Sequence, residues 1–142
     1  MKAIFRGETM FEWSDFSNVA KDLSKNTEEA YLRSSIDRHY YSLFGSSREY
    51  LIKKRNKYYL KIGGSDIHQK VRDELLNSKD LNENELGEIL NELRKLRNKA
   101  SYDKEYGKEF FEEELNKTEK DIKTAFQSLN YLKNNPPINR WS

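Results

Sequence analysis

Arg97 stands on the apolar side of a predicted helix, within the stretch LRKLRNKASYD of residues 93–103. It follows Leu93 by four residues, so the two side chains share one helical face. A guanidinium on such a face needs a carboxylate, several carbonyls or an anionic ligand to offset its desolvation. Two interpretations follow. Arg97 either binds an anion, or extends to the end of the bundle and pairs with an acid such as Asp103 or Glu92.

A second stretch, LRSSIDRHYYSLFGSS over residues 32–47, gathers hydroxyl groups around an arginine. Helical spacing places four of its residues on one side, beside the apolar stripe: Ser34, Arg38, Tyr41 and Ser42. Hydroxyls around a guanidinium suit a phosphate, and they equally suit hydrogen bonds across a pair of helices. His39 lies about 100° away on the helical wheel. We expect it to face elsewhere, as a surface or packed residue.

His68 opens a further predicted helix in the stretch SDIHQKV. The helix dipole disfavours a cation in the first turn, so a neutral imidazole is expected there. The chain has two histidines and no cysteine, and it lacks the His-Glu-x-x-His spacing. We therefore expect neither a metal site nor a cofactor.

The stretch KKRNKYY, residues 53–59, combines four cations with two tyrosines. Such a composition suits contact with phosphates and stacking on a base. It is also typical of a solvated charge run. The sequence leaves both interpretations open.

The composition is that of a single folded domain over residues 1–142, with 35% charged and 35% apolar residues. The formal net charge of +2 neither requires nucleic acid nor excludes it, because a local patch matters more than the sum. The absence of cysteine excludes disulfides and indicates a reducing cytosol. No apolar run approaches the roughly 20 residues of a membrane span, and the N-terminal MKAIFRGETMFEW lacks the apolar stretch of a signal peptide. We expect a soluble, cytoplasmic protein.

Few residues interrupt helices, since the chain has two prolines and six glycines. Apolar residues at helical spacing predict five helices: about Met10 to Ser24, Thr27 to roughly Lys54, a short helix carrying Ile67, Val71 and Leu75, about Glu83 to Ser101, and about Glu109 to Lys133. The first helix is expected to turn four residues inward: Phe16, Val19, Ala20 and Leu23.

Local signals predict how these helices begin and what joins them. Thr27 is the expected N-cap of the second helix, and Ser65 or Asp66 that of the third. YYLKI, residues 58–62, is expected to be a short extended piece, and NSKDLNENE a polar loop. The whole predicts an all-α, up-and-down antiparallel helical bundle of about five helices. Its core runs over about residues 10–134, and a short tail follows over 135–142.

Taken together, these stretches resemble the HEPN family, whose name denotes nucleotide-binding domains of higher eukaryotes and prokaryotes. The resemblance covers roughly residues 15–133 and is closest to the small stand-alone prokaryotic branch. Three segments carry it, in the order of that branch: Arg38-His39-Tyr40-Tyr41, Ile67-His68-Gln69-Lys70-Val71 and Leu96-Arg97-Asn98-Lys99-Ala100-Ser101-Tyr102. In the last segment, Ser101 stands where an aspartate is usual.

The resemblance implies a helical bundle that forms a homodimer, with the motif-bearing helices around a shared cleft. Many HEPN proteins are metal-independent ribonucleases, in which an arginine is followed after four to six residues by a histidine. The arginine and a polar partner hold the scissile phosphate, and the 2′-hydroxyl of RNA attacks it. Here Tyr102 stands in place of that histidine. A tyrosine, with a pKa of about 10, is a poor general base at neutral pH but still donates a hydrogen bond to phosphate.

The resemblance also implies a protein partner, a minimal nucleotidyltransferase encoded beside it as a toxin–antitoxin or antiviral defence pair. In related systems that partner adds AMP to a tyrosine near this motif, which makes Tyr102 a candidate acceptor.

The leading hypothesis is a dimeric HEPN bundle that binds RNA or a nucleotide by its phosphate and acts with such a partner. Arg97 and Tyr102 are its candidate catalytic residues, and the candidate binding residues are Arg38, Tyr41, Ser34, His68, Asn98 and Asp103. One alternative is a metal-independent ribonuclease toxin that uses Arg97 and Tyr102. A second alternative is a non-catalytic helical interaction module whose arginines make only internal salt bridges.

Overall fold

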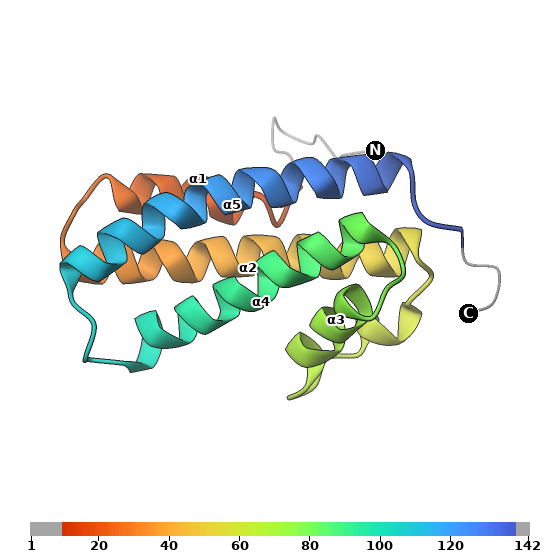
Figure 1. Cartoon of the computed structure of the whole chain (residues 1–142), viewed down its shortest axis with the longest axis horizontal. Helices are drawn as coiled ribbons and strands as arrows, with labels where there is room; N and C mark the ends of the chain where they lie inside the picture. Colours follow the sequence, from red (N-terminus) through yellow and green to blue (C-terminus); the bar gives the residue numbers. More distant parts are fainter. Residues whose placement is uncertain (1–9, 139–142) are drawn as a thin grey trace.

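The computed structural model of the chain describes residues 10–138 and is helical, without strands, over that range (Figure 1). Its elements are α1 (Asp15–Ser24), α2 (Glu29–Lys54), the 3-10 helix η1 (Tyr58–Lys61), α3 (Ile67–Leu76), α4 (Leu81–Tyr102) and α5 (Lys108–Asn134). The long helices run up and down past one another, so the predicted all-α bundle is confirmed. Residues 1–9 of the N-terminal stretch and 139–142 of the expected tail lie outside the described residues. None of the helices within 10–138 is long and apolar enough to cross a membrane.

The central helix of the bundle is α2. Helices α1, α4 and α5 all pack against it, α4 also packs on α5, and the short α3 packs chiefly on α4. Among the described elements, α1 packs on α2 alone. In Figure 1, α1 and α5 lie along one side of α2, and α3 and α4 along the other. The side chains of α2 therefore face two different surroundings.

The core consists of apolar side chains that recur at helical spacing on the long helices. Fully buried members include Ile36 and Leu43 of α2, Leu90 of α4, and Phe111 and Leu129 of α5. Complete burial of a side chain of this size contributes about 1.5–3 kcal/mol. The periodicity that predicted these helices is thus the pattern that holds them together.

Small residues let α1 and the turn before it approach α2 closely. A Cβ atom at Gly45 would lie within 2.5 Å of three ring atoms of Trp13, so only glycine fits there. Ser35 donates a hydrogen bond of 2.7 Å to the carbonyl of Ala20. Helix α2 runs unbroken through Gly45. The inward position predicted for Val19 is wrong: its side chain is 44% exposed, because α1 contacts α2 through its small residues.

Two helices begin at other residues than predicted. Helix α1 starts at Asp15 rather than Met10, and turn residues precede it. Helix α2 has Glu28, not Thr27, at its N-cap position, and the Asn26 side chain accepts a hydrogen bond of 3.0 Å from the Glu28 amide. An asparagine readily accepts from the backbone amide two residues later, which explains the displaced start.

The segments around α3 also differ from prediction. YYLKI is not extended, because Tyr58–Lys61 forms η1, with Leu60 buried and its carbonyl accepting a hydrogen bond of 2.7 Å from Arg48. Asp66 occupies the N-cap position of α3, but its side chain makes no capping bond. The polar stretch NSKDLNENE is already helical from Leu81, where the Asp80 carboxylate caps α4 by accepting from the Glu83 amide at 2.9 Å.

Candidate phosphate-binding cleft

A cleft of about 290 Å³ opens where α3 and α4 meet α2. It is lined by Tyr40 of α2, Ser65 and Asp66 before α3, His68, Gln69 and Arg72 of α3, and Arg94, Arg97 and Asn98 of α4. Three of these side chains are guanidinium groups. The carboxylate among them, Asp66, is exposed and pairs with Lys70 at 3.4 Å. The wall of the cleft is therefore strongly cationic.

Arg97 is held at the wall by polar side chains. Its Nε donates to Asp37 at 3.1 Å, its Nη2 to the Tyr41 hydroxyl at 3.1 Å, and its Nη1 to Asn98 at 3.4 Å. Burial alone lowers the pKa of Arg97, but the hydrogen bond with Asp37 and the nearby Tyr41 outweigh it, so the pKa lies above its ordinary value. The expected pairing with Asp103 or Glu92 is wrong. The acid that Arg97 contacts lies 60 residues away in sequence, on α2.

That acid does not neutralise the cleft, because Asp37 also accepts a hydrogen bond of 2.8 Å from Arg38. The remaining two guanidinium groups, of Arg72 and Arg94, each have a buried N–H without a hydrogen-bond partner among the described residues: Nη1 of Arg72 and Nε of Arg94. Burial and the charge of Arg94 both lower the pKa of Arg72. An unpaired buried donor costs about 1–3 kcal/mol, more when it is charged. The cleft thus has more donors than its own acceptors satisfy.

His68 faces the same arginines from the first turn of α3. Its Nδ1 lies 2.6 Å from the Tyr40 hydroxyl, and its ring stacks on Phe44 with centroids 4.0 Å apart. Burial lowers the pKa of His68, and Arg97, Arg72 and Arg48 lower it further. The neutral imidazole expected from the sequence is supported, although burial and the arginines, rather than the helix dipole, are the causes.

The tautomer of His68 follows from its neighbours. The charge of Arg72 acts on the Tyr40 hydroxyl, and a guanidinium offers that hydroxyl only N–H groups. Burial raises the pKa of Tyr40, so its hydroxyl keeps its proton. The arrangement that suits both neighbours turns the lone pairs of the Tyr40 hydroxyl toward Arg72 and donates its hydrogen to Nδ1 of His68. The Nε2 of His68 then bears the hydrogen and is a donor.

The structure brings only some of the predicted site residues together. Arg97, Asn98 and His68 line the cleft, and Tyr41 bonds Arg97 from α2. Tyr102, the last residue of α4, is 77% exposed, and its ring centre lies 5.9 Å from the Arg97 guanidinium carbon.

The other predicted binding residues lie elsewhere. Ser34 is exposed and does not line the cleft. Arg38 pairs with Asp37 and lies over the ring of Phe16, 5.1 Å from its centre. Asp103 follows α4, where its carboxylate accepts from the amide of Glu105 at 2.9 Å. The stripe of hydroxyls predicted on α2 is thus divided between different neighbours, because α1 covers one edge of it.

Sequence reasoning missed Arg72 and Arg94. Arg72 follows His68 by four residues and Arg94 precedes Arg97 by three, so each shares a helical face with a residue that was predicted. That spacing was a usable signal. The convergence of α3 and α4, which places the two arginines in one cleft, was not visible in the sequence.

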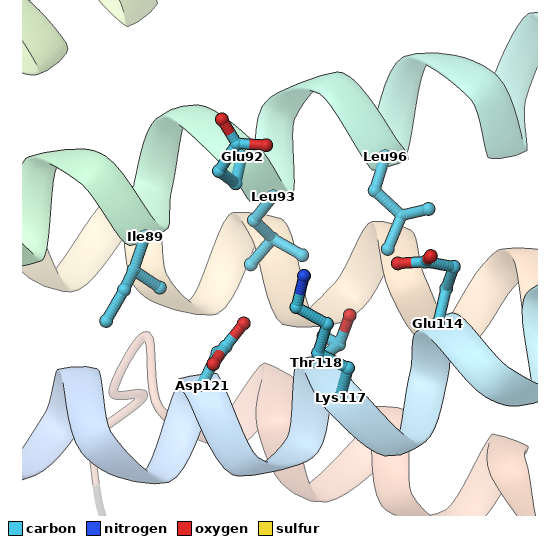
Figure 2. Close-up of a pocket in the computed structure, with 8 residues that line it drawn as sticks. All are labelled: Ile89, Glu92, Leu93, Leu96, Glu114, Lys117, Thr118 and Asp121. Atoms are coloured by element: carbon cyan, nitrogen blue, oxygen red, sulfur yellow. The ribbon is translucent and has the colours of Figure 1, made fainter.

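A second hollow, between α4 and α5, has the opposite character (Figure 2). Its volume is about 50 Å³, and the carboxylates of Glu92, Glu114 and Asp121 surround it together with the amine of Lys117. It is small and acidic, so it does not suit a phosphate. No group of three or more histidine, aspartate or glutamate side chains suited to a metal ion is found within residues 10–138.

Comparisons of the chain with protein-family models, with curated proteins and with solved structures gave no match.

Proposed function

We propose that this chain binds RNA or a nucleotide by a phosphate group in the cationic cleft between α2, α3 and α4. One observation carries the proposal: within residues 10–138, one buried N–H of Arg72 and one of Arg94 have no acceptor, while Arg97 shares its carboxylate with another arginine. A phosphate supplies several charged acceptor oxygens at once and offsets the repulsion among the three guanidinium groups.

Phosphate fits this cleft better than a carboxylate does. The donors come from two helices, with Arg72 and the Nε2 of His68 on α3, and Arg94 and Arg97 on α4. A tetrahedral anion offers three or four oxygens that point in different directions to donors on both walls, whereas a carboxylate offers two oxygens in one plane. The free N–H groups of Arg72 and Arg94 are shielded from water, so these flexible side chains must rotate by a small amount to reach a ligand.

The HEPN resemblance extends this proposal to partners. A homodimer would bring two such clefts together, and a nucleotidyltransferase would act on the exposed Tyr102 beside Arg97. In that step the Tyr102 phenol oxygen bonds to the α-phosphorus of ATP, pyrophosphate leaves, and the phenol proton passes to solvent. Such a pair is typical of a toxin–antitoxin or antiviral defence module.

Binding is tested with single-stranded RNA at one fixed salt concentration, because phosphate contacts are salt-dependent. Arg94→Met is expected to weaken RNA binding. The matched control is Lys95→Met, which removes a cation from the neighbouring, exposed position of α4, where Lys95 pairs with Glu92 at 3.1 Å. Equal loss in both variants would mean that general charge, and not the cleft, binds RNA.

The two partner proposals are tested separately. Sedimentation at micromolar concentration that shows only the 17.0 kDa monomer would overturn the homodimer. Incubation with the nucleotidyltransferase and ATP, followed by peptide mass spectrometry, is expected to place AMP on Tyr102. AMP on other residues alone, or on none, would overturn that assignment.

A second candidate function, a metal-independent ribonuclease, is favoured by the position of His68. Although no histidine follows Arg97 in the sequence, His68 lines the same cleft. In the tautomer derived above, however, its Nε2 carries a hydrogen and acts as a donor, not as a base. The test is cleavage of labelled RNA in the presence of a chelator. Products that disappear in both Arg97→Ala and His68→Asn would establish the ribonuclease, and intact RNA would leave binding as the function.

A further inference from the structure

A groove of about 590 Å³ lies on the other side of α2, between α1 and α5. Both helices pack on α2 but not on each other, so they leave a space between them whose floor is α2 itself. In Figure 1 the two helices run along the same side of α2. One α2 residue lines this groove, His39.

His39 is fully buried and has an unsatisfied ring nitrogen. Its Nδ1 lies 3.5 Å from the hydroxyl of Ser17, which donates its own proton to Ser42 at 2.7 Å. Ser17 can then only accept from His39, so Nδ1 bears the hydrogen and Nε2 keeps a lone pair. That Nε2 is buried without a hydrogen-bond partner among the described residues. Burial, reinforced by Lys21, lowers the pKa of His39 to about 4, so it is neutral.

The residues in the walls and rim of the groove indicate which kind of ligand would fit. Ile122 and Phe126 of α5 provide an apolar wall. Two exposed cations, Lys21 of α1 and Lys123 of α5, face the groove from its two sides, against one carboxylate, Glu119. A volume of this size lies within the range of small-molecule sites, which are mostly apolar with a few convergent polar groups.

We propose that this groove binds a small molecule with a flat ring, a hydrogen-bond donor on that ring, and an anionic group. The ring packs on Phe126 and Ile122, and its carboxylate or phosphate reaches Lys21 and Lys123. Because Nε2 of His39 is shielded in the free protein, side chains that line the groove must move for the N–H or O–H of the ring to donate to it. The proposal is independent of the arginine cleft, since it shares no lining residue with that cleft.

Nuclear magnetic resonance of the imidazole nitrogens separates the two sites, because the chain has two histidines and each lines one of them. The ring-and-anion probes are 4-hydroxybenzoate and uridine 5′-monophosphate. Phenol supplies the ring without the anion, and inorganic phosphate the anion without the ring. 4-Hydroxybenzoate and uridine 5′-monophosphate are expected to shift the resonances of the His39 nitrogens, and the shifts should saturate as probe is added. Inorganic phosphate is expected to shift only His68, as the arginine cleft predicts.

Variants at the rim test the anion contact without touching the core. Lys21→Ala and Lys123→Ala are each expected to weaken 4-hydroxybenzoate binding by about fivefold, the scale of one exposed ionic contact. The matched control is Lys25→Ala, one helical turn further along, where Lys25 pairs with Asp22 at 3.2 Å and does not line the groove. Its binding is expected to be unchanged.

Three results would overturn the proposal. The first is that neither ring-and-anion probe moves the His39 resonances at millimolar concentration, which would mean that a water molecule satisfies Nε2. The second is that phenol binds as tightly as 4-hydroxybenzoate, which would mean that the lysines do not contact the anionic group. The third is that the His39 resonances move with protein concentration alone, which would mean that a second copy of the chain covers the groove.

Discussion

Arg33 and Arg97 are both half-buried arginines of long helices, but their surroundings differ. Arg33 donates to the carbonyls of Lys99, Ala100 and Asp103 at 3.3, 3.0 and 2.8 Å, and to that of Tyr106 at 2.7 Å. Its Nε also donates to Glu29 at 2.9 Å. Every nitrogen of Arg33 is therefore used within the fold, and most of its acceptors are backbone carbonyls, whereas the three acceptors of Arg97 are side chains.

The acceptors of Arg33 explain its role. They are the carbonyls of Lys99 and Ala100 in the last turn of α4, where the negative end of the helix dipole lies, and those of Asp103 and Tyr106 in the loop to α5. Arg33 also lies over the ring of Phe111, 4.4 Å from its centre. It joins the last turn of α4 to α2. In the cleft, by contrast, Nη1 of Arg72 and Nε of Arg94 have no acceptor among the described residues.

Arg55 shows that an unpartnered N–H is not by itself a sign of a ligand site. Its Nη1 is also buried without a partner among the described residues. However, its Nε donates at 2.8 Å to the buried carboxylate of Glu83, which further accepts from Tyr50 and Ser78. Its charge is matched one to one. What distinguishes the cleft is therefore its unmatched positive charge together with its unpaired donors.

The largest expected effect is the loss of stability when Arg33 is replaced, because this arginine has a structural role. Arg33→Ala removes the Arg33 donors from the carbonyls of Ala100, Asp103 and Tyr106 and from Glu29, while the Lys99 carbonyl keeps the amide of Asp103. The free energy of unfolding is expected to fall by about 3 kcal/mol or more. Urea denaturation measures it. The RNA affinity of the fraction that remains folded should be unchanged. A stable variant that no longer binds RNA would mean that Arg33, too, serves a ligand.

Arg97→Ala is expected to weaken RNA binding and leave stability nearly unchanged, the reverse of Arg33→Ala. Asp37 keeps Arg38 as a partner and repulsion from the other two arginines is relieved, so the melting temperature should hardly change. RNA binding should weaken by about 1.5–3 kcal/mol, the scale of a hydrogen bond to a charged group. Arg97→Lys should restore it only in part, because the planar fork is lost. A large drop in melting temperature with unchanged RNA affinity would make Arg97 a structural arginine like Arg33.

The sequence predicted the fold better than the site, and these arginines show why. Helices follow from local periodicity, so Leu90 or Leu129 identifies its own buried face. The roles of Arg33 and Arg97 depend on which acceptors other helices bring to them, across 66 and 60 residues in the two cases. Arg97, Asn98 and His68 were predicted by spacing and resemblance. Asp37, Arg72 and the buried state of His39 required the packing of α1, α3 and α4 on their neighbours.

Arg94→Met is expected to change the free energy of unfolding by less than Arg33→Ala does, and in the opposite direction. Methionine keeps the length and the apolar contacts of the side chain but removes a buried, unpartnered donor and one of three like charges. The free energy of unfolding should rise by about 1 kcal/mol in the absence of ligand. Lys95→Met, at the exposed neighbouring position, should change it by less than about 0.5 kcal/mol. Destabilisation by Arg94→Met would mean that the cleft satisfies its own arginines after all.

The smallest expected effect is a change in the pKa of His68 when an anion binds. This pKa depends directly on the charges in the cleft. In the free protein, burial and then Arg97, Arg72 and Arg48 lower its pKa. An anion bound among these arginines offsets their charge, so the pKa of His68 should rise on binding. By linkage, the anion then binds more tightly as the pH falls through this pKa, because the protonated imidazole favours the bound state. Sulfate is the suitable probe, since its own charge stays constant over such a titration.

Imidazole resonances followed against pH, with and without sulfate, measure the change in the pKa of His68, and Arg97→Ala should reduce this change. The His39 titration serves as an internal control, because that ring lies outside the cleft. If the pKa of His68 is the same with and without sulfate, no anion sits among the arginines, and the contrast with Arg33 loses its functional meaning.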